Sequence, residues 1–250
     1  MSTSLAVSLN HIYRLDDGAI TQYLRVSPST IVAPLESPPE PAVQLACSRT
    51  TLYALSDTGR IYRRLIATNA RWSLMQSPGG VTWLSTSDEY LQALATNVLH
   101  RPYSGQVFGL LASAPVATRL VQIDHDETML HALTEDGRIL VRLFAGGWHE
   151  YPKLGAVREV VAGLDMVYAR TANGDVYRSL SYGSSGWQAL GIDGALALAV
   201  PADHADELYI ATDEGNRVVT PLAWHGDNVV RAWVTEDWVS SDWVVTAEAA

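Results

Sequence analysis

Residues 167–178 read VYARTANGDVYR, and residues 52–63 read LYALSDTGRIYR. A third version, LHALTEDGRILVR, occupies residues 130–142. Each version has two short runs of alternating apolar and polar residues on either side of a turn that contains glycine. This pattern is typical of a β-hairpin, because a strand alternates its side chains between two faces and glycine accepts a positive φ. The chain therefore repeats one hairpin at places far apart in the sequence.

The repeat continues through the whole chain. With the aromatic residue of LYAL as a register mark, six marks follow at spacings of 40, 39, 39, 37 and 41 residues: Tyr13, Tyr53, Gln92, His131, Tyr168 and Tyr209. A turn pair follows each mark: Asp17-Gly18, Thr58-Gly59, Asn97-Val98, Asp136-Gly137, Asn173-Gly174 and Glu214-Gly215. The Asp-Gly and Asn-Gly pairs predict two-residue turns in which both central residues have positive φ.

Two further strand-like segments surround each hairpin. In the fifth copy, VREVVAG (157–163) precedes the hairpin and GWQALGI (186–192) follows it. Four strands per unit at a period near 40 residues predict a propeller blade, and the period-two alternation argues against a helical repeat. The sequence therefore predicts an all-β, six-bladed β-propeller with four antiparallel strands per blade, closed as a single domain over residues 1–250. The expected blades are 3–38, 39–78, 79–116, 117–154, 155–192 and 193–236.

Three segments depart from the regular pattern. The proline-rich residues 27–42 are expected to form the outer strand of the first blade and its link to the second. The third copy lacks the turn glycine and has two prolines in residues 98–115, so we expect a distorted blade with its prolines at edge positions. Residues 237–250 alternate like a strand, and we expect a tail or a clasp onto the first blade, which would protect an open edge.

Composition limits the possible partners. The net charge is −10, and residues 193–250 hold eleven acidic residues against two basic ones, so nearly all the excess negative charge lies in the last quarter. This balance argues against nucleic-acid binding, which depends on Lys and Arg.

The longest apolar run, residues 195–200, is far too short to span a membrane. With one cysteine, Cys47, and no secretory signal at the start, we expect a cytoplasmic protein, although non-classical export stays open.

The aligned repeats resemble a known family. An apolar-Tyr-Ala strand, a turn glycine, Ile or Val followed by Tyr-Arg, and a later tryptophan resemble tectonin-type repeats. The residues that carry the resemblance in the second and fifth copies are Tyr53, Gly59, Ile61, Tyr62, Arg63 and Trp72, and Tyr168, Gly174, Val176, Tyr177, Arg178 and Trp187. The fourth copy matches in part, and the other three depart. More loosely, the chain is similar to the regulator-of-chromosome-condensation class of propeller. The resemblance implies a propeller fold and, for tectonins, glycan binding or a role in recognition.

The sequence holds no strong catalytic or metal-binding motif. It has no nucleophile elbow, phosphate-binding loop, dinucleotide fingerprint or zinc-protease helix, so we expect no enzyme activity, no cofactor and no metal. Two acidic segments, IDHDE (123–127) and PADHADE (201–207), occupy equivalent places before the fourth and sixth hairpins. We expect both on one rim of the propeller, and they make Asp124, His125, Asp203 and His204 candidate binding residues. Solvated polar loops and, for the first segment, a metal site are the alternatives.

Tryptophans recur in two settings. Trp72, Trp148 and Trp187 follow the turns at similar offsets, which favours packing between neighbouring blades over stacking against sugars. Residues 227–245, DNVVRAWVTEDWVSSDWVV, combine large aromatics with one sign of charge, which is typical of a protein-binding patch, although packing against the first blade is the alternative. The candidate partner-binding residues there are Asp227, Trp233, Glu236, Asp237, Trp238, Asp242 and Trp243.

Two functions remain open from the sequence. The leading hypothesis is a non-enzymatic protein-interaction module, an adaptor, assembly factor or inhibitor, that binds a basic protein surface through its acidic last blade and rim loops. The alternative is a tectonin-like lectin that binds glycans. An enzyme is the third possibility, because propellers also host active sites and a fold alone does not decide function.

Overall fold

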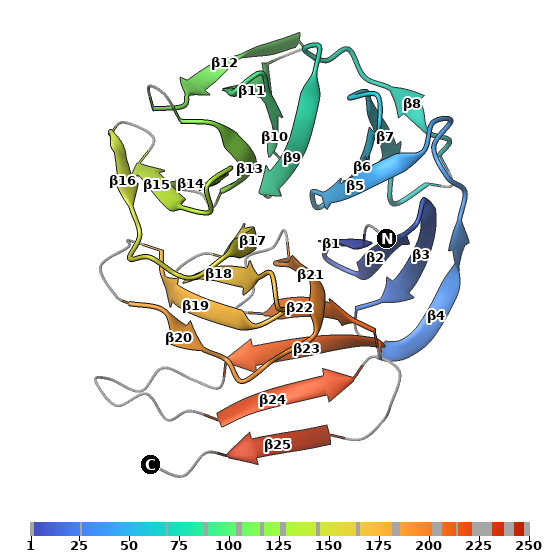
Figure 1. Cartoon of the computed structure of the whole chain (residues 1–250). Helices are drawn as coiled ribbons and strands as arrows, with labels where there is room; N and C mark the ends of the chain where they lie inside the picture. Colours follow the sequence, from blue (N-terminus) through green and yellow to red (C-terminus); the bar gives the residue numbers. More distant parts are fainter. Residues whose placement is uncertain are drawn as a thin grey trace.

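The structure is a computed structural model that describes residues 3–25, 27–68, 70–87, 90–103, 107–115, 118–125, 129–143, 146–163, 166–181, 186–201, 207–213, 215–221, 232–237 and 243–247. These residues form six small antiparallel sheets arranged in a ring, with no helix among them (Figure 1). The predicted six-bladed β-propeller is therefore confirmed. Within the same residues, no helix is long and apolar enough to cross a lipid bilayer.

Each blade is built from consecutive strands. Blades one to three are β1 (Thr3–Val7), β2 (His11–Asp16), β3 (Ala19–Leu24) and β4 (Ser27–Leu35); β5 (Ala42–Cys47), β6 (Thr51–Ser56), β7 (Ile61–Leu65) and β8 (Ser73–Leu74); and β9 (Val81–Ser87), β10 (Tyr90–Ala95), β11 (Val98–Tyr103) and β12 (Val107–Ser113). Blades four and five are β13 (Leu120–His125), β14 (Met129–Thr134), β15 (Ile139–Leu143) and β16 (Trp148–Glu150); and β17 (Val157–Ala162), β18 (Met166–Thr171), β19 (Val176–Leu180) and β20 (Gln188–Ala189). Blade six is β21 (Ala195–Ala199), β22 (Leu208–Thr212), β23 (Gly215–Pro221), β24 (Ala232–Asp237) and β25 (Trp243–Ala247).

The first strand of every blade lies innermost and contacts the first strands of both neighbouring blades. The order around the ring is β1, β5, β9, β13, β17 and β21, and β21 contacts β1, which closes the circle. All six register marks lie in the second strands, and their side chains are at most 9% exposed. The repeated position therefore marks a buried site in each blade, as the period predicted.

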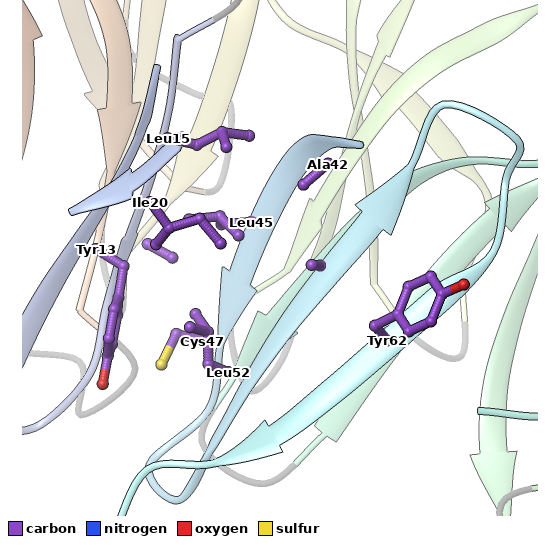
Figure 2. Packing of buried hydrophobic residues seen from close by; sticks show 10 residues of the cluster. Tyr13, Leu15, Ile20, Ala42, Leu45, Cys47, Leu52 and Tyr62 are labelled. Atoms are coloured by element: carbon purple, nitrogen blue, oxygen red, sulfur yellow. The ribbon is translucent and has the colours of Figure 1, made fainter. Parts of the chain in front are cut away.

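Apolar side chains fill the gaps between neighbouring blades. The cluster in Figure 2 joins Tyr13, Leu15 and Ile20 of blade one to Leu45 and Leu52 of blade two. Corresponding clusters lie at the other junctions, including one between blade six and blade one. Burying one large aliphatic side chain contributes about 1.5–3 kcal/mol. Because a single hairpin has no such partner face, each blade depends on its neighbours.

The turns differ in part from the prediction. At Asp17-Gly18 both residues have positive φ, as expected for a two-residue turn. At Gly137 and Gly174 only the glycine does, because these hairpins have longer turns in which one glycine takes the left-handed conformation. In the third copy the turn residues are Thr96 and Asn97, with φ of 50° and 64°, one position earlier than predicted.

The outer edges also test the sequence analysis. The proline-rich segment forms β4 and the link to β5, as predicted. In blade three the pairing of β11 with β10 ends at His100, so Pro102 pairs only with β12 and interrupts no ladder on its other side. Of the segment 237–250, which was expected to be a tail or a clasp onto the first blade, residues 243–247 pair with β24 as a fifth strand of blade six. The clasp stays a prediction.

Candidate functional site

The inner strands surround a cavity of about 740 Å³, to which all six of them contribute lining residues. Charged side chains line it from several blades. Five are acidic (Asp16, Asp17, Asp124, Glu159 and Asp213) and three are arginines (Arg14, Arg158 and Arg170). A concave site of this volume with convergent polar groups is the usual form of a binding pocket. Sequence reasoning did not predict it, because no single segment contains more than a few of its residues.

A register shift shapes most of the inner strands. In β5, β9, β13, β17 and β21 one extra residue interrupts the pairing with the second strand, whereas the β1–β2 pairing has no such shift. Such a β-bulge changes the direction of the side chains beside it. Two of the extra residues, Val43 and Arg158, are exposed and line the cavity. The residue that follows the extra one in each of these strands lies at the junction with the next blade. These residues are Gln44, Trp83, Gln122, Glu159 and Ala197.

That following residue often bridges two blades. The Gln44 amide accepts from the Leu84 N–H and donates to the Leu84 carbonyl, both at 2.8 Å. The Gln122 amide makes the same pair of bonds with Val160. Among the described residues, the inner strands of neighbouring blades are not paired by backbone hydrogen bonds, and these side-chain amides connect them instead. Because both Gln side chains are buried, each bond is worth about 1 kcal/mol and leaving a partner unpaired would cost more.

Blade five uses a carboxylate in the same place. The Leu198 N–H donates to Glu159 Oε2 at 3.1 Å, and Arg170 Nε donates to the same oxygen at 2.8 Å. Burial raises the pKa of the Glu159 carboxyl, against the opposing effects of Arg170 and the Leu198 N–H. Glu159 is thus a buried carboxyl that bridges blades five and six, and it also lines the cavity.

Asp124 and His125 are not loop residues as predicted; they end the inner strand β13. Asp124 Oδ2 accepts from the Ala162 N–H of blade five at 2.7 Å, and Ser85 of blade three donates to Asp124 Oδ1 at 2.5 Å. Ser85 Oγ also lies 2.8 Å from His125 Nδ1, and His125 is 3% exposed. These side chains connect three blades and line the cavity, which fits neither a solvated loop nor an isolated metal site. In the described part of the chain, no group of His, Cys, Asp or Glu residues is arranged to hold a metal.

The two outermost strands of blade six, which carry the predicted acidic and aromatic residues, are described only as backbone. Glu236 is the ladder partner of both Val218 and Trp243, Asp237 is that of Arg217, and Trp233 is that of Thr246. These residues lie on β24 and β25, the outermost strands of blade six (Figure 1). The other predicted residues lie outside the described residues: Asp203, His204, Asp227, Trp238 and Asp242.

The recurrent tryptophans pack as the favoured interpretation predicted. Trp72 Nε1 donates to the Glu36 carbonyl at 2.6 Å, and Trp187 Nε1 donates to the Pro152 carbonyl at 2.8 Å. Both carbonyls belong to the link that enters the blade of that tryptophan. Trp148 is half-buried and packs against the apolar cluster between blades three and four. Trp72 and Trp187 therefore fasten the outer edge of a blade to the link that precedes it, and Trp148 packs at a junction between blades.

An ion pair at the junction of blades one and six was not predicted. Arg25, between β3 and β4, donates to Glu207 Oε2 at 2.7 Å and to the Tyr209 hydroxyl at 3.0 Å. The guanidinium also lies 5.9 Å from the centre of the Tyr209 ring. The two partners are 182 residues apart, and Arg25 has no counterpart in the other repeats, so no spacing in the sequence marks it.

No protein-family model and no curated protein sequence matches the chain. Solved structures do match it. A chain of the nidogen/laminin complex gives a TM-score of 0.64 at 12% identity, covering 84% of this chain and 88% of that one. A chain of Kap60 bound to yeast RCC1 (Prp20) gives 0.59 at 11% identity, with coverages of 86% and 69%. YCF48 bound to D1 peptide gives 0.56 at 13% identity, with coverages of 83% and 74%.

These similarities concern the fold. At such identities they show a β-propeller, which is the fold that the looser resemblance to the regulator-of-chromosome-condensation class implies. The tectonin resemblance stays a prediction.

Proposed function

We propose that this propeller is a non-enzymatic module that binds a protein partner through its acidic last blade and the adjacent rim loops. The observation that carries the proposal is the coincidence of charge and architecture in blade six. Residues 193–250 hold eleven of the 27 acidic residues, and the same segment adds a fifth strand that the other sheets lack. The extra strand β25 carries no charge itself, but it pairs with β24, which ends in Glu236 and Asp237. The outer part of blade six therefore combines a sheet extension with acidic residues, and the ring itself does not need that extension.

The similar structures support a binding role for the fold. Three of them are complexes: Kap60 with Prp20, nidogen with laminin, and YCF48 with D1 peptide. These partners are those of the similar proteins. For this chain they favour a protein partner over a small-molecule substrate. We infer that the partner presents a basic surface, because acidic residues exceed basic ones by nine in residues 193–250.

Charge reversal in blade six tests the proposal. Glu236→Lys combined with Asp242→Lys should weaken partner capture by about tenfold or more, since charge complementarity at an interface is then reversed. Asp237 is left unchanged because its ladder partner is Arg217. Capture from a native extract at low and high salt, read by mass spectrometry, identifies proteins that are lost both with the variant and with added salt.

A matched control separates this surface from total charge. Asp57→Lys with Glu135→Lys changes the net charge equally at exposed positions of blades two and four, and it should leave capture unchanged. Equal loss in both double variants would contradict the proposal. A glycan array with the wild-type protein tests the lectin alternative, in which the indole N–H groups of Trp72 and Trp187 are already used within the protein.

A further inference from the structure

One residue position in the inner strand of each blade faces a backbone N–H in the inner strand of the next blade. Four of the six blades carry an acceptor there. Ser4 accepts from the Leu45 N–H, Gln44 from Leu84, Gln122 from Val160, and Glu159 from Leu198. In each receiving strand, this N–H belongs to the residue that pairs with the position after the register mark. It therefore points away from its own blade, toward the neighbouring inner strand and the channel.

Two blades break the pattern. Trp83 occupies the position in blade three and Ala197 occupies it in blade six, and neither side chain accepts a hydrogen bond. The N–H groups left over belong to Ile123 in β13 and Leu5 in β1, which have the same register as the four bridged residues. Among the described residues, neither N–H has a hydrogen-bond partner outside its strand pairing.

The two open edges face each other. In a ring of six inner strands, β1 and β13 lie three places apart in either direction, so they stand on opposite sides of the channel (Figure 1). All five residues of β1 line the 740 Å³ cavity, and so do Trp83 and the two neighbours of Ile123. An extended segment of about five residues spans roughly 16 Å, which matches the length of β1. The cavity thus has the length, the free donor and the aromatic wall that such a segment needs.

The charge of the lining selects among segments. Five carboxylates against three guanidinium groups give the cavity an excess of negative charge. Asp17 and Asp213 are exposed and lie in adjacent blades at its lining, with no hydrogen bond or ion pair to described residues. A cationic side chain on an entering segment would be attracted to them, and an acidic one repelled.

We propose that the central channel binds an extended peptide segment with at least one Lys or Arg, which adds as a strand to the inner edge of β1. A carbonyl of the segment accepts from the Leu5 N–H, and its side chains contact Trp83 beside the opposite edge. The proposal rests on the function proposed above only in that the segment belongs to a protein partner. The site is separate from the acidic blade six.

The test places a hydrogen-bond acceptor at position 197, where blade six has none. Ala197→Gln gives blade six the amide that blades two and four use, and Ala197→Ser copies Ser4 if the larger side chain does not fit. Either variant should cover the Leu5 N–H and slow its hydrogen exchange, which in the wild type should be at least tenfold faster than that of Leu84 or Val160. Ala189→Gln, an exposed position on β20, is the matched control.

Binding is measured with a phage-displayed library of random 12-residue peptides. Peptides enriched on the wild-type propeller should carry Lys or Arg, bind the Ala197 variants at least tenfold more weakly, and bind Ala189→Gln unchanged. Synthetic versions with alternate N-methylated amides should lose binding, because a strand needs its backbone groups. Equal binding to the Ala197 variants, or no enriched peptide at all, would overturn the proposal and leave only water in the channel.

The two proposals fail in different ways. If the blade-six reversals abolish partner capture while the Ala197 variants leave it and peptide binding unchanged, the channel proposal falls and the function stands. If the reversals leave partner capture unchanged while peptides still bind the channel and lose affinity in Ala197→Gln, the acidic blade is wrong and the channel proposal stands.

Discussion

Blades two, four and five complete their outer edges differently from blades one, three and six. The former have outer strands of two or three residues, each with a tryptophan directly before it or at its first position, and Trp72 and Trp187 donate to a carbonyl of the preceding link. Blades one and three have long outer strands, the nine residues of β4 and the seven of β12, with no tryptophan in them or directly before them, and blade six ends in the five-residue β25. An aromatic ring with one indole hydrogen bond thus replaces most of a strand ladder. The repeat motif is strong where this replacement was made and weak elsewhere.

The turn glycines separate the two groups of blades further, and replacing one of them should cause the largest loss of stability. Gly174 in blade five has a φ of +85°, and a Cβ there would lie 2.9 Å from the backbone nitrogens of Gly194 and Ala195. Gly174→Ala should therefore destabilise the protein by about 2–5 kcal/mol, combining the cost of a left-handed alanine with a backbone clash. Urea unfolding measures the loss.

Gly18 in blade one is the matched control. Its φ is +87°, but a Cβ there would meet nothing within 4 Å. Gly18→Ala should cost only the conformational strain, about 1–2 kcal/mol. Equal losses at the two glycines would show that the turns of the regular blades do not depend on close approach to the next blade.

The tryptophan that fastens a regular blade gives a smaller effect. Trp187→Ala should cost about 2–3 kcal/mol, because a half-buried ring packed on Tyr151 and its hydrogen bond to Pro152 are both lost. Trp187→Phe removes mainly the indole N–H and should cost about 1 kcal/mol. Both losses are read from urea midpoints.

A second regular blade checks the role of the indole. Trp72→Phe should reproduce the loss of Trp187→Phe, since Trp72 bonds the equivalent link carbonyl at Glu36. Unequal losses would mean that the two blades are fastened by different contacts despite their shared motif.

The fold was predictable because its signal is periodic. The register marks, the strand alternation and the turn glycines each recur six times or nearly so, and a ring that buries equivalent positions needs such recurrence. The turn of blade three was misplaced by one residue because Thr96 and Asn97 take the left-handed conformation without glycine. Asn does so more readily than most residues, which is the signal that was available.

The cavity was not predictable for the opposite reason. Its bridging position holds Ser, Gln, Trp, Gln, Glu and Ala in successive blades, which share no chemistry that a sequence comparison would align. In five of the six blades a β-bulge, which shifts the register by one residue, brings the side chain to this place, and Ser4 of blade one reaches it without a bulge. The pair of Arg25 and Glu207 is hidden for a similar reason, since it occurs once, where the ring closes.

The smallest effect concerns Glu159, the one carboxyl among the residues at the bridging position of the six inner strands. Glu159→Gln keeps an acceptor for the Leu198 N–H and makes blade five resemble blades two and four. Because burial raises the pKa of Glu159 in the folded protein, the wild type loses stability as pH rises above the carboxyl's ordinary pKa, when the unfolded state releases a proton that the folded state retains. Below that pH both side chains are neutral and the two proteins should be nearly equal. The stability difference in favour of Glu159→Gln should therefore grow from pH 4 toward pH 7 in urea midpoints.

Gln122→Glu is the reciprocal variant. It places a carboxyl at a position where the native side chain is 2% exposed, and it should acquire the pH dependence that Glu159→Gln loses. If the difference instead shrinks with rising pH, the attraction of Arg170 outweighs burial, and Glu159 is a stabilising ion pair rather than a tolerated charge.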